Sequence, residues 1–137
     1  MIDKQTSELL LRLAARYETP QFIQGDPSWW MHQVEGPLSQ EATAFVASVL
    51  SYGSRAQFMP KIGHLLDLAG GDMDRWLRSG AYADAFADGD KDCFYRLYNR
   101  GTMRSFFDAY SCLLHEHGSL GEYVGTTDGL GAVEAIC

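Results

Sequence analysis

The segment 42–50 constrains the fold more than any other part of the sequence, because it is apolar on almost every side. Its sequence is Ala-Thr-Ala-Phe-Val-Ala-Ser-Val-Leu, in which the only polar residues, Thr43 and Ser48, are small. A helix with no polar face has no side to turn toward water, so it must lie inside its fold. We expect Ser39 to cap this helix and Gly53 to mark the point where the chain leaves it. The sequence therefore predicts a fold arranged around one buried helix.

Apolar residues recur at helical spacing in several other segments. A first helix is expected to begin at Thr6 or Ser7, and a long one to begin at Thr102. Further helices are expected after Arg55, where Pro60 would fall inside the helix, and between Asp72 and Gly80, with a last turn capped by Ser119. No stretch of four or more residues alternates in the strand period. We therefore predict an all-α class: a compact bundle with about five substantial helices and some short ones.

Composition and charge narrow the class of protein. The 137 residues are 46% hydrophobic, which is enough for a single domain over 1–137 with a core of its own. The net charge of −7 argues against nucleic acid and anionic membranes as partners of the molecule as a whole. There is no apolar run long enough to cross a membrane and no signal peptide. Three widely spaced cysteines fit reduced thiols, so we expect a cytoplasmic protein.

The common catalytic and cofactor motifs are missing. The sequence has no phosphate-binding loop, no dinucleotide fingerprint and no Cys-x-x-Cys pair. His115-Glu116-His117 resembles a metal site at first, but two histidines two residues apart on a helix point about 200° away from each other. Positive charge near a helix C-terminus explains this pair without a metal. We expect no metal, no cofactor and no catalytic residue.

The corner that follows the apolar helix is the most specific local feature. Small polar residues, a glycine and an arginine stand between two expected helices, at Ser51, Tyr52, Gly53, Ser54 and Arg55. A helix N-terminus binds anions through its free amides, and arginine adds a fork of donors. The corner is therefore a candidate anion or nucleic-acid site. The alternative is an ordinary turn whose arginine meets a carboxylate.

Three arginines form the only basic stretch. Arg96, Arg100 and Arg104 lie four residues apart, with no acidic residue between Cys93 and Phe107, and aromatic residues stand among them. A phosphate- and base-contacting surface would have this composition. A core element whose arginines pair with acids from elsewhere in the chain would have it too. Gly101 is expected to break the helix between the arginines.

A third group of residues surrounds a tryptophan pair. Asp26, Trp29 and His32 could line a small pocket that holds an acid and a base. Tryptophans in such a segment also serve to anchor irregular chain to a core. Both interpretations stay open at this point.

The order and spacing of many residues resemble a bacterial family of uncharacterised proteins whose members are longer than this chain. The resemblance runs from Arg16 to about Tyr123. It rests on Arg16-Tyr17, Pro20, Phe22-Ile23, Asp26-Pro27, His32, Glu41, Phe45, Ala47, Tyr52-Gly53, Arg55, Leu65-Leu66, Phe94, Arg96 and Gly118-Ser119-Leu120. The chain departs from the family where Met31 precedes His32, because the family usually has a proline there.

The second half of longer members looks similar to the helix-hairpin-helix DNA glycosylase superfamily. In that superfamily a helix with a Leu-Ser-type corner precedes the DNA-facing region, and 49–53 resembles this corner. The resemblance implies DNA as a partner, bound through a local basic patch, with the catalytic half outside this chain. The rival hypothesis is a non-enzymatic interaction module. It would form a homodimer through the apolar segment 128–137, where the chain looks as if it enters an unfinished helix.

Overall fold

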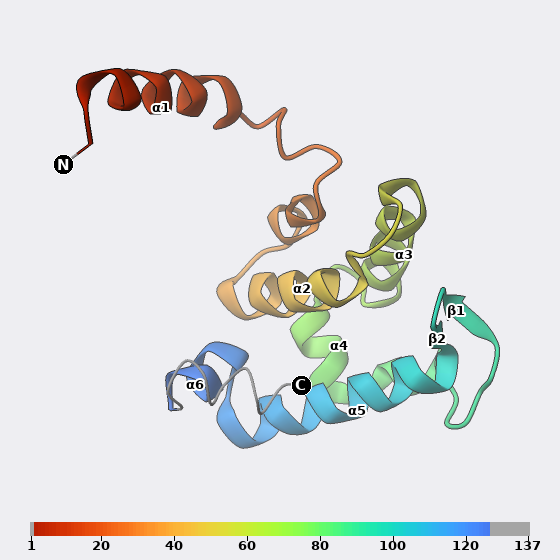
Figure 1. Cartoon of the computed structure of the whole chain (residues 1–137). Helices are drawn as coiled ribbons and strands as arrows, with labels where there is room; N and C mark the ends of the chain where they lie inside the picture. Colours follow the sequence, from red (N-terminus) through yellow and green to blue (C-terminus); the bar gives the residue numbers. More distant parts are fainter. Residues whose placement is uncertain (1, 127–137) are drawn as a thin grey trace.

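The computed structural model describes residues 2–126, and this part of the chain is predominantly helical (Figure 1). Its α-helices are α1 (Lys4–Tyr17), α2 (Pro37–Leu50), α3 (Arg55–Leu68), α4 (Met73–Ser79), α5 (Arg100–His117) and α6 (Leu120–Gly125). Two 3-10 helices, η1 (Pro27–Gln33) and η2 (Ala81–Asp84), join them, and strands β1 (Cys93–Tyr95) and β2 (Tyr98–Asn99) pair antiparallel. The predicted all-α class is confirmed. No helix within residues 2–126 has the length and apolar character needed to cross a bilayer.

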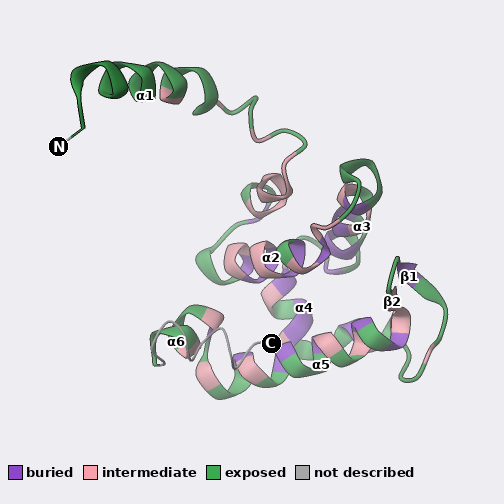
Figure 2. Ribbon diagram, viewed as in Figure 1, coloured by how far each residue is buried: buried purple, intermediate pink, exposed green. Residues whose placement is uncertain are grey.

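Helix α2 is the central helix, as the segment 42–50 predicts. It packs against η1, α3, α4 and α6, and it carries the buried residues Ser39, Ala42, Thr43, Val46, Ala47 and Leu50. Figure 2 shows these buried positions concentrated where α2, α3, α4 and α5 face one another. An apolar helix in the middle lets each neighbour bury a single face against it.

Ser39 does not cap its own helix, contrary to the prediction. Helix α2 begins two residues earlier, at Pro37 after Gly36, because the fixed φ of proline suits a first helical position. The hydroxyl of Ser39 is buried and accepts a hydrogen bond of 3.1 Å from the amide of Met73. Ser39 therefore provides a hydrogen-bond acceptor for the first amide of α4. Asp72 caps the same helix by accepting from the amide of Arg75.

Glu41 acts in the same way on α6. Its carboxylate accepts hydrogen bonds from the amides of Leu120 at 3.0 Å and Gly121 at 2.9 Å. Ser119 caps this helix through the amide of Glu122, as predicted. A carboxylate at a helix N-terminus is favoured by the free amides and by the helix dipole. One turn of α2 thus fixes where two other helices begin.

Aromatic rings fill the core on the other side of α4. Phe107 of α5 lies 5.2 Å from Trp76, 5.5 Å from Tyr82 and 5.3 Å from Phe86, measured between ring centroids. Phe86 also contacts Phe94 of β1 at 5.4 Å, edge to face. Such pairs contribute ~1 kcal/mol each beyond the burial of their area. They attach η2 and the hairpin to α4 and α5.

Two further helix starts, and the hairpin, differ from the sequence prediction. Asp3 caps α1 through the amide of Thr6, so Thr6 lies inside the helix. Helix α5 begins at Arg100 because Asn99 accepts a hydrogen bond from the amide of Thr102, and Gly101 therefore lies inside its first turn without breaking it. The two short strands before it have no counterpart in the prediction, because they are too short to show alternation.

Helix α1 lies away from the rest of the molecule (Figure 1). It has no buried residue, and four of its leucines and Tyr17 are more than a third exposed. The ring of Tyr17 contacts Phe22 at a centroid distance of 5.2 Å, which is a contact within the same N-terminal segment. The helix is amphipathic, but its apolar face meets no element of the body.

The cap on α6 can be tested at Glu41. We expect Glu41→Ala to lower the free energy of unfolding by ~1 kcal/mol, because two amides of α6 lose a charged acceptor. Urea unfolding would measure this loss. Glu35→Ala, which removes an exposed glutamate two residues before α2, is the matched control and should change stability little. Equal losses in both variants would show that the Glu41 contact adds nothing.

The hydroxyl of Tyr110 gives a second prediction. It is buried and finds no hydrogen-bond partner within residues 2–126, whereas Tyr82 donates to Asp108 at 2.8 Å. We expect Tyr110→Phe to raise the free energy of unfolding by ~1 kcal/mol and Tyr82→Phe to lower it by a similar amount. Unfolding of both variants at neutral pH checks the opposite signs. A loss of stability in Tyr110→Phe would contradict the prediction.

The same residue makes stability depend on alkaline pH. Burial, with the nearby carboxylates of Glu41 and Asp74, raises the pKa of Tyr110 above its ordinary value. The folded state therefore keeps the hydroxyl proton to a higher pH than the unfolded state does, so stability does not depend on this group below the unfolded-state pKa, which is about 10, and falls as the pH rises above it. We expect the wild type to lose stability more steeply above pH ~10 than Tyr110→Phe does.

Candidate functional site

The predicted corner lies between the end of α2 and the start of α3. Ser51 closes α2 by donating its hydroxyl to the carbonyl of Ala47, and Gly53 then turns the chain with φ +83°. Ser54 precedes α3, and its carbonyl accepts from the amides of Gln57 and Phe58. Its side chain makes no capping hydrogen bond. Helix α3 therefore begins with first-turn amides that no side chain caps.

The hairpin brings Arg96 onto this corner. The hydroxyl of Tyr95 donates to the carbonyl of Tyr52, and the amide of Leu97 donates to the Tyr52 hydroxyl at 3.4 Å. The guanidinium of Arg96 lies 5.8 Å from the centre of the Tyr52 ring and so close to Gly53 that a Cβ there would clash with it. Residues more than 40 positions apart in the sequence thus form one surface. We call Ser51–Arg55, Lys61 and Arg96 the corner site.

Arg96 is held in a conformation that arginine rarely adopts. It is the one non-glycine residue with positive φ, at +51°, in the part of the chain that the structure describes. A left-handed conformation costs an L-residue ~1–2 kcal/mol. Arg96 is also exposed, so its side chain offsets only part of this cost through packing. The contacts of the hairpin with Tyr52 hold the turn in place.

A second cation, Lys61 of α3, lies beside the hairpin. Its ammonium is 5.1 Å from the centre of the Phe94 ring, and a ring face attracts a cation. An open groove of about 520 Å³ runs between α3 and β1, lined by Ala56, Gln57, Pro60, Lys61 and Cys93–Arg96. Its lining contains two cationic side chains and no carboxylate. The groove therefore presents positive charge in a protein of net charge −7.

Arg55 occupies the other side of the corner. Its guanidinium lies 3.9 Å from the carboxylate of Asp26, and its side chain is 69% exposed. Asp26 also accepts hydrogen bonds from the hydroxyl and the amide of Ser28, and these bonds, with a smaller contribution from Arg55, lower the pKa of Asp26. A pair this long and this exposed contributes little to stability. Arg55 thus keeps most of its donors available to another anion.

Arg100 and Arg104 do not share a surface with Arg96. Both lie on α5, and each bonds a main-chain carbonyl of the segment before the hairpin, that of Ala85 at 2.6 Å and that of Phe86 at 3.1 Å. The Nε of Arg104 also donates to both carboxylate oxygens of Asp108, at 2.9 and 3.0 Å, and Arg100 approaches Asp90 at 3.6 Å. Their side chains are 32% and 24% exposed. These contacts of Arg100 and Arg104 agree with the alternative prediction, in which the arginines pair with acids and hold an element of the core.

The residues of the predicted pocket separate into different surroundings. Asp26 begins η1 and contacts Arg55, as above. His32 lines an apolar hollow of about 560 Å³ with residues 17–20 and 22–23, and Asp26 does not line it. Trp30, the neighbour of Trp29, packs its ring on Gly63 of α3, where a Cβ would come within 2.7 Å of it. That contact fits the anchoring role of the tryptophan pair.

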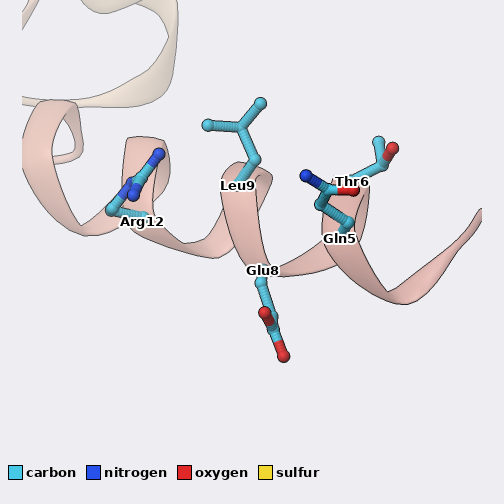
Figure 3. A pocket seen from close by; sticks show the side chains of 5 residues that line it. All are labelled: Gln5, Thr6, Glu8, Leu9 and Arg12. Carbon is cyan, nitrogen blue, oxygen red and sulfur yellow. The ribbon is translucent and has the colours of Figure 1, made fainter.

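Neither the metal-ligating side chains nor the hollow beside α1 forms a further binding site within residues 2–126. No group of three or more His, Cys, Asp or Glu side chains within residues 2–126 is placed to hold a metal ion. A hollow of about 480 Å³ is lined by α1 alone, through Gln5, Thr6, Glu8, Leu9 and Arg12. Figure 3 shows these side chains pointing outward from one helix, with Glu8 opposite Leu9 and Arg12. One helix cannot enclose a ligand.

Sequence reasoning missed Lys61 and the approach of Arg96 to Gly53. Lys61 shows no local signal, since a lone lysine on a helix is usually solvated. The hairpin does have a signal, because aromatic residues stand on both sides of the two-residue step Arg96-Leu97. That pattern would have placed Arg96 at a turn and off the helix.

The clash at Gly53 can be tested against a matched glycine. Gly25 has φ +81° and free space around its Cα, so Gly25→Ala adds backbone strain alone, ~1 kcal/mol. We expect Gly53→Ala to cost more, because the new methyl group must also displace Arg96. The excess should vanish when both variants are made in an Arg96→Ala background. Equal costs in the wild-type background would show that Arg96 does not lie on Gly53.

A family model described as "Protein of unknown function (DUF2400)" matches residues 26–135, and the chain belongs to this family. The resemblance to an uncharacterised family is thereby confirmed. The matched region contains the corner site and begins after α1. No curated protein matches the chain, and no solved structure matches it.

Proposed function

We propose that this member of the DUF2400 family binds nucleic acid at the corner site, through the phosphate backbone. One observation carries the proposal: the hairpin holds Arg96 in a rare conformation directly over Gly53, and it lines one groove with Ala56 and Gln57 of the uncapped first turn of α3. Backbone strain at an exposed cation is a reason to expect a role in binding. Arginine forks and helix N-termini are common phosphate ligands.

The distribution of charge agrees with one small contact surface. Nucleic-acid affinity comes largely from cations that neutralise phosphates. The corner site supplies Arg55, Lys61 and Arg96, and the only carboxylate that contacts them in residues 2–126 is that of Asp26. The acidic remainder of the protein would repel a polyanion elsewhere. Outside the basic helix α1, a nucleic acid is therefore expected to meet the molecule at this face.

The aromatic residues of the site favour backbone contacts over base stacking. Tyr52 is half-buried under Arg96, with its ring 5.2 Å from Tyr95 and 5.7 Å from Tyr98. Phe94 is buried beneath Lys61. Rings that are already packed offer no free face to a base. We therefore expect binding with little sequence preference.

The resemblance of 49–53 to the Leu-Ser-type corner of helix-hairpin-helix DNA glycosylases makes duplex DNA the first ligand to try. The proposal assigns to residues 2–126 a part in holding DNA and assigns them no catalytic residue. A role in DNA repair follows from the same resemblance and rests on it alone.

The test is a titration of labelled duplex and single-stranded DNA by fluorescence anisotropy at two salt concentrations. We expect Arg96→Ala and Arg55→Ala each to weaken binding and to lower the slope of log K against log[salt] by about 1. Arg75→Ala is the matched control, because Arg75 is a similarly exposed arginine, on α4. It should leave the affinity and the slope unchanged.

Arg104→Ala separates the two interpretations of the basic stretch. We expect it to lower stability, through the lost bonds to Phe86 and Asp108, and to leave the salt slope as in the wild type. No binding of either DNA by the wild-type protein at low salt would overturn the proposal. So would equal effects of Arg96→Ala and Arg75→Ala.

A second candidate function, a helical interaction module that forms a homodimer, is favoured by the exposed apolar face of α1. The apolar segment 128–137, through which the sequence predicts a homodimer, lies outside the residues that the structure describes. Light scattering tests this candidate, and a strict monomer at high protein concentration would count against it.

A further inference from the structure

The body of the molecule has an apolar groove for which the described chain provides no cover. It lies between α2, α5 and α6 and has a volume of about 220 Å³. Its walls include Phe45 of α2, Phe106, Ala109 and Leu113 of α5, and Leu120 and Tyr123 of α6. Phe45 and Phe106 are partly buried and stack at a centroid distance of 5.9 Å. Three helices thus form a cleft with apolar walls and an open side.

Helix α1 has the shape and pattern of a ligand for such a groove. Leu9, Leu10, Leu13 and Tyr17 share one face through their spacing of three and four, and all are more than a third exposed. A helix of 14 residues is marginal in water when it stands alone, and most helices in proteins owe their stability to packing of an apolar face. An amphipathic helix that lies in a hydrophobic groove uses just this spacing for its anchors.

The charges of the two surfaces are complementary. Helix α1 has three basic residues against one acidic residue, Glu8, which Lys4 approaches at 3.8 Å. Arg12 and Arg16 therefore have no acidic partner on α1. Figure 3 shows Arg12 on the same side of the helix as Leu9, with Glu8 on the other.

Three glutamates lie near the groove walls, and the ring of His117 contacts that of Tyr123 at a centroid distance of 4.7 Å. Glu41 precedes Phe45 by one turn, Glu116 follows Leu113 by one turn, and Glu122 adjoins Tyr123. The wall residues themselves include no lysine or arginine. A basic helix is therefore attracted to this groove, whereas two α1 helices repel each other.

We propose that α1 of one copy of this chain docks in the groove between α2, α5 and α6 of a second copy. Each copy offers one helix and one groove, so two copies close into a symmetric dimer with both apolar faces covered. Within one chain, α1 lies apart from α5 and α6 (Figure 1). The inference deepens the second candidate function, rests on it, and does not depend on nucleic-acid binding.

The first test uses light scattering coupled to size-exclusion chromatography on the full chain. We expect a dimer for the wild type, and a molar mass lower by half for the double variant Leu10→Glu/Leu13→Glu. Leu11→Glu is the matched control, because Leu11 is a 69% exposed leucine on the opposite face of α1, and it should remain a dimer. Ala109→Glu places a charge in the groove at an exposed position, so it should give a monomer without unfolding the body.

The second test places the two surfaces in different copies. Cys112 is exposed and lies one turn from Ala109 on α5, so a spin label on Cys112, with Cys93 and Cys137 changed to serine, reports on the groove. Mixed with an unlabelled, isotope-enriched copy, it should broaden the signals of residues 9–17 in that copy. The same mixture with Leu10→Glu/Leu13→Glu in the enriched copy should show no broadening.

The outcomes separate the docking mode from dimerisation itself. A wild-type monomer overturns both the docking and the second candidate function. A dimer that Ala109→Glu leaves intact overturns the docking alone. The docking is also overturned if broadening appears in a chain that carries both the label and the isotope but is absent from the mixture. Circular dichroism of each variant confirms that the body is folded, so a change in mass reports on the interface.

Discussion

The hydrogen bonds that the first turns of α2 make to the starts of other helices hold the arrangement of the body. The hydroxyl of Ser39 accepts from the amide of Met73, and the carboxylate of Glu41 accepts from the amides of Leu120 and Gly121. Amides at a helix start that are buried without a partner would cost more than the bonds themselves contribute. The apolar stripe of α2 supplies burial, and these two polar residues decide the position of α4 and α6 along it. Glu41 thus helps to hold α6 beside the groove that lies between α2, α5 and α6.

The three arginines of the basic stretch differ in the groups that they contact. Arg100 and Arg104 bond carbonyls of residues 85 and 86 and approach carboxylates, and they lie over the rings of Phe86 and Tyr82. These contacts attach the loop before the hairpin to α5. Arg96 instead lies over Tyr52 and Gly53 at the surface. The same residue type therefore has a structural role in two positions and is exposed at the surface in the third.

Charge and apolar surface are both unevenly distributed. The corner site gathers three cations in an acidic protein, and α1 carries a basic amphipathic face whose four leucines are all more than a third exposed. Repulsion among the cations is relieved by counterions or by an anionic partner. Exposure of the leucines to water is relieved only when a partner buries them. The two proposals concern different partners at different surfaces. The function of this family member is therefore best sought with one experiment on each surface.

The sequence by itself determined the fold class and the central helix, because an apolar segment without a polar face has one place to go. It also determined local caps such as those at Asp72 and Ser119, since these bonds join residues three positions apart. Only the tertiary structure decided the partners of Ser39 and Glu41, because their hydrogen bonds span 34 and about 80 residues. It likewise decided that Arg96 meets Gly53, and that Lys61 joins them. No local pattern encodes which surface a turn will reach once the rings around Phe107 have packed and placed the hairpin.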